Sequence, residues 1–313
     1  MSTKTATKTP LIDNLALKLA RLYYRKDRAE PREVRKLAEL HSNPASSYED
    51  FLEGDTIFPS RQGFDGGSRH WDIAFINGSS RVAPPPHGEA GDIIVQGSTL
   101  ILQVRNDPNF DQKRAKWQRG VAAAEKYNNA YIIGMGGFIP TPRQSILVEC
   151  RMKISAGFHG STGMWVQEIN TFNPKTGIMV KPFRSFGFSY LGEASDAYIR
   201  GLAIETVLGL SIQNKQSAGD VDISNWHTYS MLWSWINTDM QRVMFTIDDQ
   251  NIGYFNMHPF GPGEIQLWAD NYQIGRGLKI GYLNVPDVDE TLYDWIRITA
   301  LEEKRAGVAN DAL

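Results

Sequence analysis

Apolar and polar residues alternate with a period of two between Asn225 and Ala300, and this pattern constrains the fold more than any other feature of the chain. The segment contains the blocks WHTYSMLWSW, QRVMFTIDDQNIGYF, GEIQLWADN and YDWIRITA. Alternation at this period places successive side chains on opposite faces of an extended strand. The four blocks therefore predict half-buried antiparallel strands, each with one face in a core.

Similar patterns recur upstream. In SILVECRMKI, residues 145–154, the apolar residues that share one face are Ile146, Val148, Cys150, Met152 and Ile154. Gly97-Ser98, between residues 93–95 and 99–104, is a hairpin signal, and residues 202–212 read as one further strand. The sequence thus predicts a mainly β protein built from two stacked antiparallel sheets.

The first 55 residues have a different pattern. Apolar residues fall on one stripe of a predicted first helix at Leu11, Ile12, Leu15, Leu19, Leu22 and Tyr23. Pro31 is suited to the first turn of a second helix, which carries Val34, Leu37 and Ala38 on one side. Residues 42–70 are rich in Ser, Pro, Gly and Asp and predict a linker that wraps onto the sandwich. We expect a helical extension over 1–55, a sandwich over 56–300 and a tail over 301–313. The helices either pack on the sandwich or join copies of the chain into a homo-oligomer.

Composition restricts the function. The 313 residues are 42% hydrophobic, enough for a large core, and carry a formal net charge of −2 without a basic cluster, which argues against a nucleic-acid partner. Apolar runs fall short of the ~20 residues that cross a bilayer, so no membrane partner is expected. The first residues show no signal-peptide core, and the single cysteine, Cys150, excludes an internal disulfide framework. These features predict a cytoplasmic protein.

Four sequence motifs follow one another along the chain. VECRMKISAGFHGSTGMW (148–165) combines Glu-x-Arg-x-Lys with a glycine-rich loop and a tryptophan strand; WHTYSMLW, FTIDDQNIGYF and YDWIRI follow. In order and spacing, over about residues 70–300, they resemble glycoside hydrolase family 16 of the concanavalin A-like lectin/glucanase superfamily. The resemblance implies a jelly-roll sandwich with a sugar cleft on the concave sheet and Trp165 at its centre.

The catalytic signature of that family, Glu-x-Asp-x-x-Glu, is absent from the chain. In the corresponding region, RSFGFSYLGEASDAYIR, the only carboxylates are Glu193 and Asp196. Retaining glycosidases hold two carboxyl groups ~5–5.5 Å apart, whereas residues three apart on a regular strand point to different faces. The pair is therefore more easily read as part of a solvated loop than as a catalytic pair.

The strand GEIQLWADN offers a different set of candidate residues. Alternation places four polar or aromatic side chains on one face: Glu264, Gln266, Trp268 and Asp270. An indole stacks on the apolar C–H face of a sugar, while acid and amide groups bind its hydroxyls. We expect Trp165, Gln266, Trp268 and Asp270 to bind ligand; the competing interpretation is an exposed outer face.

Two residues are candidates for acid/base chemistry. Glu264 belongs to the face just described, and His159, in the loop FHGSTG, would lie at the rim of the cleft, where a histidine can move protons near neutral pH. The family resemblance further implies a structural calcium near the aspartate of the closing strand, Asp294. Calcium needs six to eight oxygen ligands, and one matched residue does not make such a set; no other cofactor is expected.

Two functions of different classes remain open. The first is a carbohydrate-recognising jelly-roll protein, either lectin-like or a glycan-active enzyme with a non-standard catalytic site. The alternative is an intracellular biosynthetic enzyme, of the cyclase or isomerase type, that binds a bulky, partly apolar small molecule in the cleft; the missing catalytic motif and the many aromatic residues favour it. A purely structural protein that interacts through its helices is a third interpretation.

Overall fold

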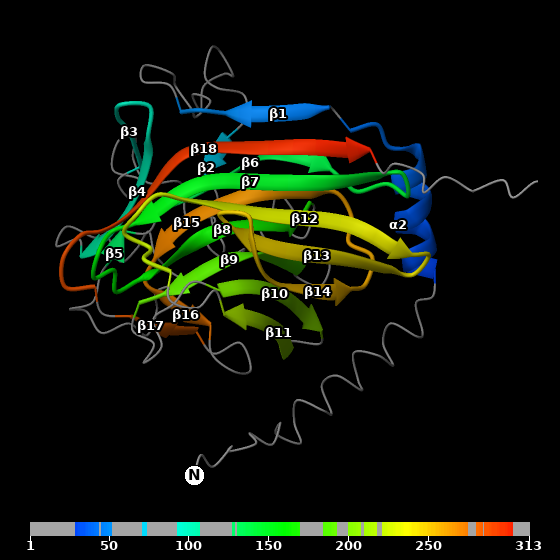
Figure 1. The fold of residues 1–313 in the computed structure, drawn as a ribbon. Helices are drawn as coiled ribbons and strands as arrows, with labels where there is room; N and C mark the ends of the chain where they lie inside the picture. Colours follow the sequence, from blue (N-terminus) through cyan, green and yellow to red (C-terminus); the bar gives the residue numbers. More distant parts are fainter. Residues whose placement is uncertain are drawn as a thin grey trace, which may run out of the picture.

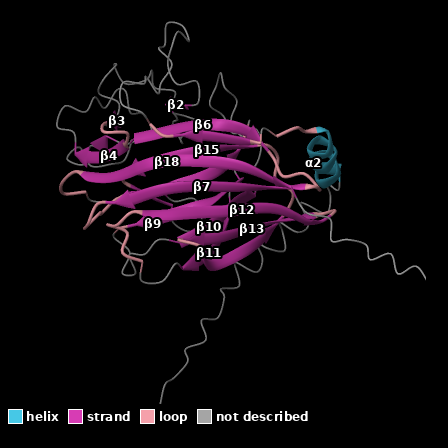
Figure 2. Cartoon of the chain, turned by 45° about the horizontal axis from the view of Figure 1, so that its top comes forward, coloured by secondary structure: helices cyan, strands magenta, loops and turns pink. Residues whose placement is uncertain are grey.

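The computed structural model describes residues 29–43, 45–51, 71–73, 93–106, 127–128, 130–169, 184–192, 200–207, 210–217, 221–274, 280–283 and 285–302. Within these residues the chain forms two antiparallel sheets that lie face to face, with one helix at the end of the strands (Figures 1 and 2). This is the mainly β jelly-roll sandwich that the alternating blocks and the family resemblance predict. No helix in the described part of the chain is long and apolar enough to cross a membrane.

Sheet A has the strand order β14-β13-β12-β7-β18-β4-β3, with β1 beside β18 and β5 beside β4. Its strands are β1 (Ser46–Glu49), β3 (Ile93–Val95), β4 (Leu100–Asn106), β5 (Tyr127–Asn128), β7 (Gln144–Ile154), β12 (His227–Asn237), β13 (Met240–Ile247), β14 (Gln250–Met257) and β18 (Asp289–Glu302). Sequence neighbours β12, β13 and β14 are also neighbours in the sheet, whereas β7 lies between β12 and the closing strand β18.

Sheet B has the order β11-β10-β9-β8-β15-β6-β2. Its strands are β2 (Trp71–Ile73), β6 (Ala130–Phe138), β8 (Ser161–Glu168), β9 (Arg184–Leu191), β10 (Arg200–Val207), β11 (Leu210–Ser217) and β15 (Gly263–Asp270). A separate ribbon pairs β16 (Tyr272–Ile274) with β17 (Ile280–Tyr282). The single strand predicted over 202–212 is wrong, because the chain reverses within it and forms the β10–β11 hairpin.

The core lies between the two sheets and is built from the alternating faces. All five residues predicted to share a face of β7 have no exposed surface. Aromatic rings meet edge to face across the layers, as for Phe186 with Trp233 (centroids 5.3 Å apart) and Phe188 with Tyr229 (5.1 Å). Burial of these large side chains is the main stabilising term of the fold.

Turn residues set the register of two hairpins. Gly97 and Ser98, between β3 and β4, have φ of 58° and 56°, and Asp248 and Asp249, between β13 and β14, have φ of 47° and 64°. Positive φ at both central residues is typical of the type I′ turn, whose twist matches that of paired strands. The hairpin predicted at Gly97-Ser98 is confirmed.

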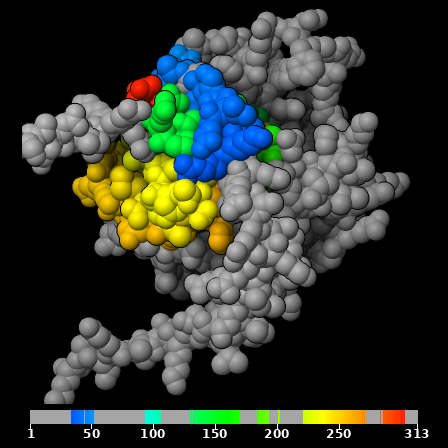
Figure 3. Space-filling view, turned by 90° about the vertical axis from the view of Figure 1, so that its right-hand side faces the viewer, coloured from blue at the N-terminus to red at the C-terminus, as the bar shows by residue number. Residues whose placement is uncertain are grey.

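The helix α2 (Ala29–Leu40) confirms the second predicted helix, with Pro31 in its first turn. It lies at one end of the sandwich (Figure 3), where Ala38 is fully buried and Val34 half-buried, but Leu37 is 46% exposed. Asn43, just after the helix, exchanges hydrogen bonds with the backbone N–H and C=O of Ile139. The first predicted helix lies outside the described residues.

The segment 42–70 is not only a linker. Within it, β1 pairs with β18 along four residues, so sheet A includes chain that comes before residue 56. The strand was missed because it has only four residues, which is too short for its alternation of buried and exposed side chains to stand out among the Ser and Pro residues around it.

Candidate functional site

The two faces of sheet B differ in chemistry. On β8 and β15 one face enters the core and carries Met164, Val166, Ile265, Leu267 and Ala269. The opposite face, which we call the Trp165 face, carries Trp165 and Gln167 from β8 and Glu264, Gln266, Trp268 and Asp270 from β15. Since β8 and β15 are adjacent and antiparallel, Gln266 lies directly beside Trp165 and Glu264 directly beside Gln167. The structure thus brings the predicted ligand-binding residues of the two strands together.

Trp165 and Trp268 form an indole pair at the centre of this face. Their ring centroids are 4.4 Å apart and their planes are inclined by 58°. Two glycines make room for them: a Cβ at Gly163 would come within 2.8 Å of Trp268 Cη2, and one at Gly187 within 2.7 Å of Trp165 Cδ1. Trp268 Nε1 donates a hydrogen bond to Ser161 Oγ (3.1 Å). The glycines of SFGF and STGM are therefore part of the same arrangement as the tryptophans.

The face is enclosed rather than open. Trp165 is 5% exposed, Trp268 2% and Gln266 1%. Neither tryptophan belongs to the core cluster between the sheets, so this burial occurs on the outer side of sheet B. The predicted residues share one face, but as it stands this face is not a groove open to solvent.

Glu264 is a titratable group of this face in an unusual environment. Burial raises its pKa from 4.5 to about 7, since desolvation disfavours the carboxylate. The described residues provide its carboxyl group with no hydrogen bond or ion pair. A carboxyl group that is half protonated near neutral pH can donate or accept a proton, as a general acid or base must.

His159 lies at the other end of the strands. The carboxylate of Asp289, which is almost fully buried, accepts hydrogen bonds from the backbone N–H groups of His159 (2.5 Å) and Gly160 (2.8 Å) and lies 3.5 Å from His159 Nδ1. Gly160 packs against the carbonyl of Asp270, six residues along β15 from Glu264. At ~3.3 Å per residue, His159 and Glu264 are separated by about 20 Å. The two acid/base candidates therefore cannot act on one bond together.

The strand after the tryptophan strand supplies no carboxylate to this face. On β9 the residues that point away from the core are Ser185, Gly187 and Ser189, since Phe186, Phe188 and Tyr190 point into it. Glu193 and Asp196 lie outside the described residues. Among the described side chains, no second acid thus lies at the separation from Glu264 that a retaining glycosidase requires, because Asp270, the other acid of this face, is six residues along β15, about 20 Å away.

Ser185 and Gln167 are residues of the site that the sequence analysis did not select. Gln167 lies between Glu264 on β15 and Ser185 on β9 in the register of the three strands. Alternation from Trp165 identifies Gln167 as a neighbour, but Ser185 has no such signal, because a serine in RSFGFSYL is unremarkable until the strand is placed beside β8.

Two side chains of the Trp165 face, a glutamine and a serine, have buried oxygen atoms with no hydrogen-bond partner among the described residues. They are Gln266 Oε1 and Ser185 Oγ, whose residues are 1% and 2% exposed. A buried polar group without a partner costs about 1–3 kcal/mol, so such atoms are rare in folded proteins. The remaining acid of the strand, Asp270, is also buried, at 3% exposed.

Asp294 lies on the outer surface of sheet A, at the bulge of β18. Its Oδ2 accepts a hydrogen bond from Arg151 Nη1 (2.7 Å), and no group of three or more His, Cys, Asp or Glu side chains suited to a metal occurs among the described residues. An arginine that already neutralises the carboxylate does not fit a calcium ligand set. The described residues therefore give the predicted calcium site no support.

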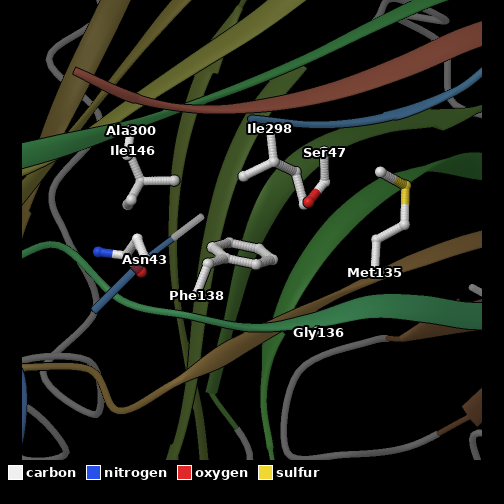
Figure 4. A pocket seen from close by; sticks show the side chains of 8 residues that line it. All are labelled: Asn43, Ser47, Met135, Gly136, Phe138, Ile146, Ile298 and Ala300. Carbon is white, nitrogen blue, oxygen red and sulfur yellow. The ribbon is translucent and has the colours of Figure 1, made fainter. Parts of the chain in front are cut away.

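A small pocket lies elsewhere, near the α2 end of the sandwich (Figure 4). It is lined by Asn43, Ser47, Met135, Gly136, Phe138, Ile146, Ile298 and Ala300. This lining has one amide and one hydroxyl side chain and no acid or base. The pocket is thus unsuited to acid/base chemistry, which leaves the Trp165 face as the candidate site.

The architecture is that of the concanavalin A-like lectins and glucanases. The chain matches a structure described with endo-acting O-glycanases of the human gut microbiota that initiate mucin breakdown, at 14% identity and TM-score 0.55, covering 82% of this chain and 99% of that one. It also matches the catalytic domain of an endo-1,3-β-glucanase (laminarinase) from Thermotoga petrophila (17%, TM-score 0.53, 82% and 97%). A β-glucanase from Bacillus licheniformis is similar (15%, TM-score 0.51, 82% and 99%). At these identities the likeness shows the fold alone.

No protein-family model matches the sequence, and no curated protein matches it either. The likeness to family 16 is therefore a likeness of fold, shown by the comparison of structures. Any argument about function has to come from the residues of the Trp165 face.

Proposed function

We propose that this chain is a carbohydrate-recognising jelly-roll protein that binds sugar on the Trp165 face, with Glu264 as its single acid/base group. One observation carries the proposal: two indoles, an amide and an unpaired carboxyl group converge on one face of a sheet outside the core. The glycan-directed activities of proteins with the same fold support it by analogy only.

Each residue has a distinct part in binding. The face of the Trp165 indole would stack on the apolar C–H face of a sugar ring, as aromatic side chains do with flat apolar surfaces. Gln266 beside it would accept a hydrogen bond from a hydroxyl group. Glu264, protonated about half of the time near pH 7, would donate to the ligand in one form and accept from it in the other.

Among the described side chains, Glu264 has no second carboxyl group beside it, so the site differs from that of a retaining hydrolase. Such an enzyme needs a nucleophile and an acid/base about 5–5.5 Å apart, and Ser185, Gly187 and Ser189 stand where β9 faces the site. Turnover, if the protein has it, would then be proton transfer by Glu264 without a covalent glycosyl intermediate.

The test combines binding with turnover. Purified protein is measured against a panel of mono- and oligosaccharides and against laminarin and lichenan, together with the Trp165→Ala, Glu264→Gln and His159→Ala variants. We expect saccharide binding that Trp165→Ala abolishes, and negligible hydrolysis of either glucan. Robust glucan hydrolysis would contradict the single-acid site, and turnover that neither Glu264→Gln nor His159→Ala changes would remove both candidates.

The enclosure of the face favours the second candidate function, a biosynthetic enzyme of the cyclase or isomerase type. Indoles that are 5% and 2% exposed suit a bulky, partly apolar small molecule held away from water. A single acid of pKa about 7 could start such a reaction by protonation. Neighbouring genes separate the two functions, since polysaccharide loci support the first and a biosynthetic cluster the second.

The remaining expectations stay predictions. They are the cytoplasmic location, the homo-oligomer formed through the N-terminal helices and the calcium ion near Asp294. The calcium ion is the weakest of these predictions, because the Asp294 carboxylate already forms an ion pair with Arg151.

A further inference from the structure

Gln266 Oε1 and Ser185 Oγ are buried on the Trp165 face without a hydrogen-bond partner among the described residues, and their chemistry indicates which groups a ligand would supply. We propose that Gln266 and Ser185 bind hydroxyl groups of a short sugar, one or two rings long, enclosed against Trp165, and that the site does not take a long glycan chain. This inference rests on the proposed function, since it names the class of carbohydrate for the same site.

The first argument is the chemistry of the two atoms. Gln266 Oε1 only accepts hydrogen bonds, and Ser185 Oγ can accept or donate. Both lie on residues that are at least 98% buried, and neither atom has a partner among the described residues. A hydroxyl-rich ligand supplies donors to both, whereas an apolar ligand would leave them unpaired.

The second argument is the register, which places the atoms around one indole. Gln266 is directly beside Trp165 on β15, and Gly187 is directly beside it on β9. Two residues further along each strand, on the same face, a second row across the three strands consists of Glu264, Gln167 and Ser185. With strands ~4.8 Å apart, this row spans about 10 Å, the scale of one or two sugar rings.

The third argument concerns length. The Trp165 and Trp268 rings are 4.4 Å apart, which leaves no room for a sugar ring between them, because an intervening ring would need about twice the ~3.5–4 Å contact distance. Trp268 is also held in place by Ser161 and lies over Gly163. A ligand on Trp165 is therefore blocked on the Trp268 side and confined to the side of Gln167, Ser185 and Glu264.

The experiment first separates a ligand-binding amide from a structural one. Gln266→Met removes the unpaired acceptor at nearly constant volume, so the unfolding temperature should stay equal or rise. Gln241→Met is the matched control: Gln241 is also fully buried, but its Oε1 accepts hydrogen bonds from Trp233 Nε1 (2.9 Å) and Phe260 N–H (2.8 Å). That variant should lower the unfolding temperature by several degrees.

Binding is then measured by calorimetry with glucose, galactose, mannose, N-acetylglucosamine, cellobiose and laminaribiose, and with laminarin and lichenan. We expect at least one short sugar to bind and neither polymer to do so. Gln266→Met and Ser185→Ala should each weaken that binding about tenfold, as the loss of one hydrogen bond does.

The outcomes distinguish this inference from the proposed function. Binding of the polymers without the short sugars would overturn the enclosed short-sugar site and leave carbohydrate recognition standing. No binding of any saccharide would overturn both. Short-sugar binding that is equal in the wild type and both variants, or a Gln266→Met variant destabilised as strongly as Gln241→Met, would show that these side chains serve the fold instead.

Discussion

Glu168 and Glu264 lie on adjacent strands of sheet B but on opposite faces, and their carboxyl groups have different surroundings. On the core side, Glu168 is 4% exposed and its Oε1 accepts a hydrogen bond from the backbone N–H of Gly261 (2.9 Å). On the Trp165 face, Glu264 has no partner among the described residues, and its pKa rises to about 7. Two buried glutamines show the same contrast, because Gln241 Oε1 accepts two hydrogen bonds and Gln266 Oε1 accepts none from the described residues.

This difference separates polar groups that stabilise the fold from polar groups available for a ligand. A buried group with partners contributes modestly to stability and is costly to remove. A buried group without partners costs stability in the free protein, and that cost is recovered when a ligand supplies the hydrogen bond. The same residue types therefore take opposite roles in the core and on the Trp165 face.

The largest expected effect concerns the packing beneath the indole pair. Gly163→Ala places a methyl group against the Phe188 carbonyl and within 2.8 Å of Trp268 Cη2. We expect the free energy of unfolding, measured in urea, to fall by about 3 kcal/mol or more, because backbone and a buried ring must both move. Gly97→Ala is the control, with φ of 58° but nothing within 4 Å of the added Cβ, and should cost only about 1 kcal/mol. Equal effects would show that the indole pair does not depend on this glycine.

The next effect is the pH dependence from Glu264. Its folded pKa, about 7, lies above its ordinary value of 4.5, so ionisation favours the unfolded chain. The resulting destabilisation is absent below about pH 4.5, grows as pH rises, and is complete above about pH 7. Glu264→Gln should therefore be more stable than the wild type at pH 8, by about 2 kcal/mol, and equal to it at pH 4. Glu149→Gln, which removes a carboxylate that is paired with Arg297, is the control. A pH-independent difference for Glu264→Gln would contradict the desolvated carboxyl group.

A smaller effect with the opposite sign is expected from His227, whose ring is fully partnered. Burial lowers the pKa of His227. Hydrogen bonds to Asp248 and to the Asp222 carbonyl, together with the charges of both aspartates, raise it by more, so the folded pKa lies above 6.5. A raised histidine pKa stabilises the fold below pH 6.5 and loses this contribution as pH rises through the folded pKa. His227→Gln should be less stable than wild type by about 1 kcal/mol at pH 5.5, with the gap narrowing by pH 8.5. A gap that widens with pH would refute the assignment.

The smallest effect concerns Asp294. Its ion pair with Arg151 is partly exposed, with side chains 30% and 44% accessible, and pairs of this kind contribute about 0–1 kcal/mol. Asp294→Asn should lower the unfolding temperature by at most a degree or two, and calcium or EDTA should not change that temperature in either protein. A calcium-dependent rise that Asp294→Asn removes would establish the metal site that the resemblance implies.

Several features of the fold were predictable because they depend on local patterns. Alternation predicted the core face of β7, and Gly97-Ser98 predicted its hairpin, since both follow from the conformations that short stretches of chain favour. The prediction of one strand over 202–212 failed for the same reason: the period of alternation along the chain does not by itself reveal where the chain reverses. β1 was missed because four residues carry too little pattern.

For the candidate site, the sequence by itself determined which residues could share a face: Glu264, Gln266 and Trp268 on one strand, Trp165 and Gln167 on another. It also determined that the family's paired carboxylates are missing. Only the tertiary structure decided that β15 lies against β8 and β8 against β9, which pairs Gln266 with Trp165 and introduces Ser185. It alone decided that Glu168 has a hydrogen-bond partner, whereas Glu264 has none among the described residues. The physical reason is that alternation is a local property of one strand. Register, burial and the presence or absence of hydrogen-bond partners depend on contacts between distant segments, such as Trp165 and Gln266, which are about 100 residues apart in the chain.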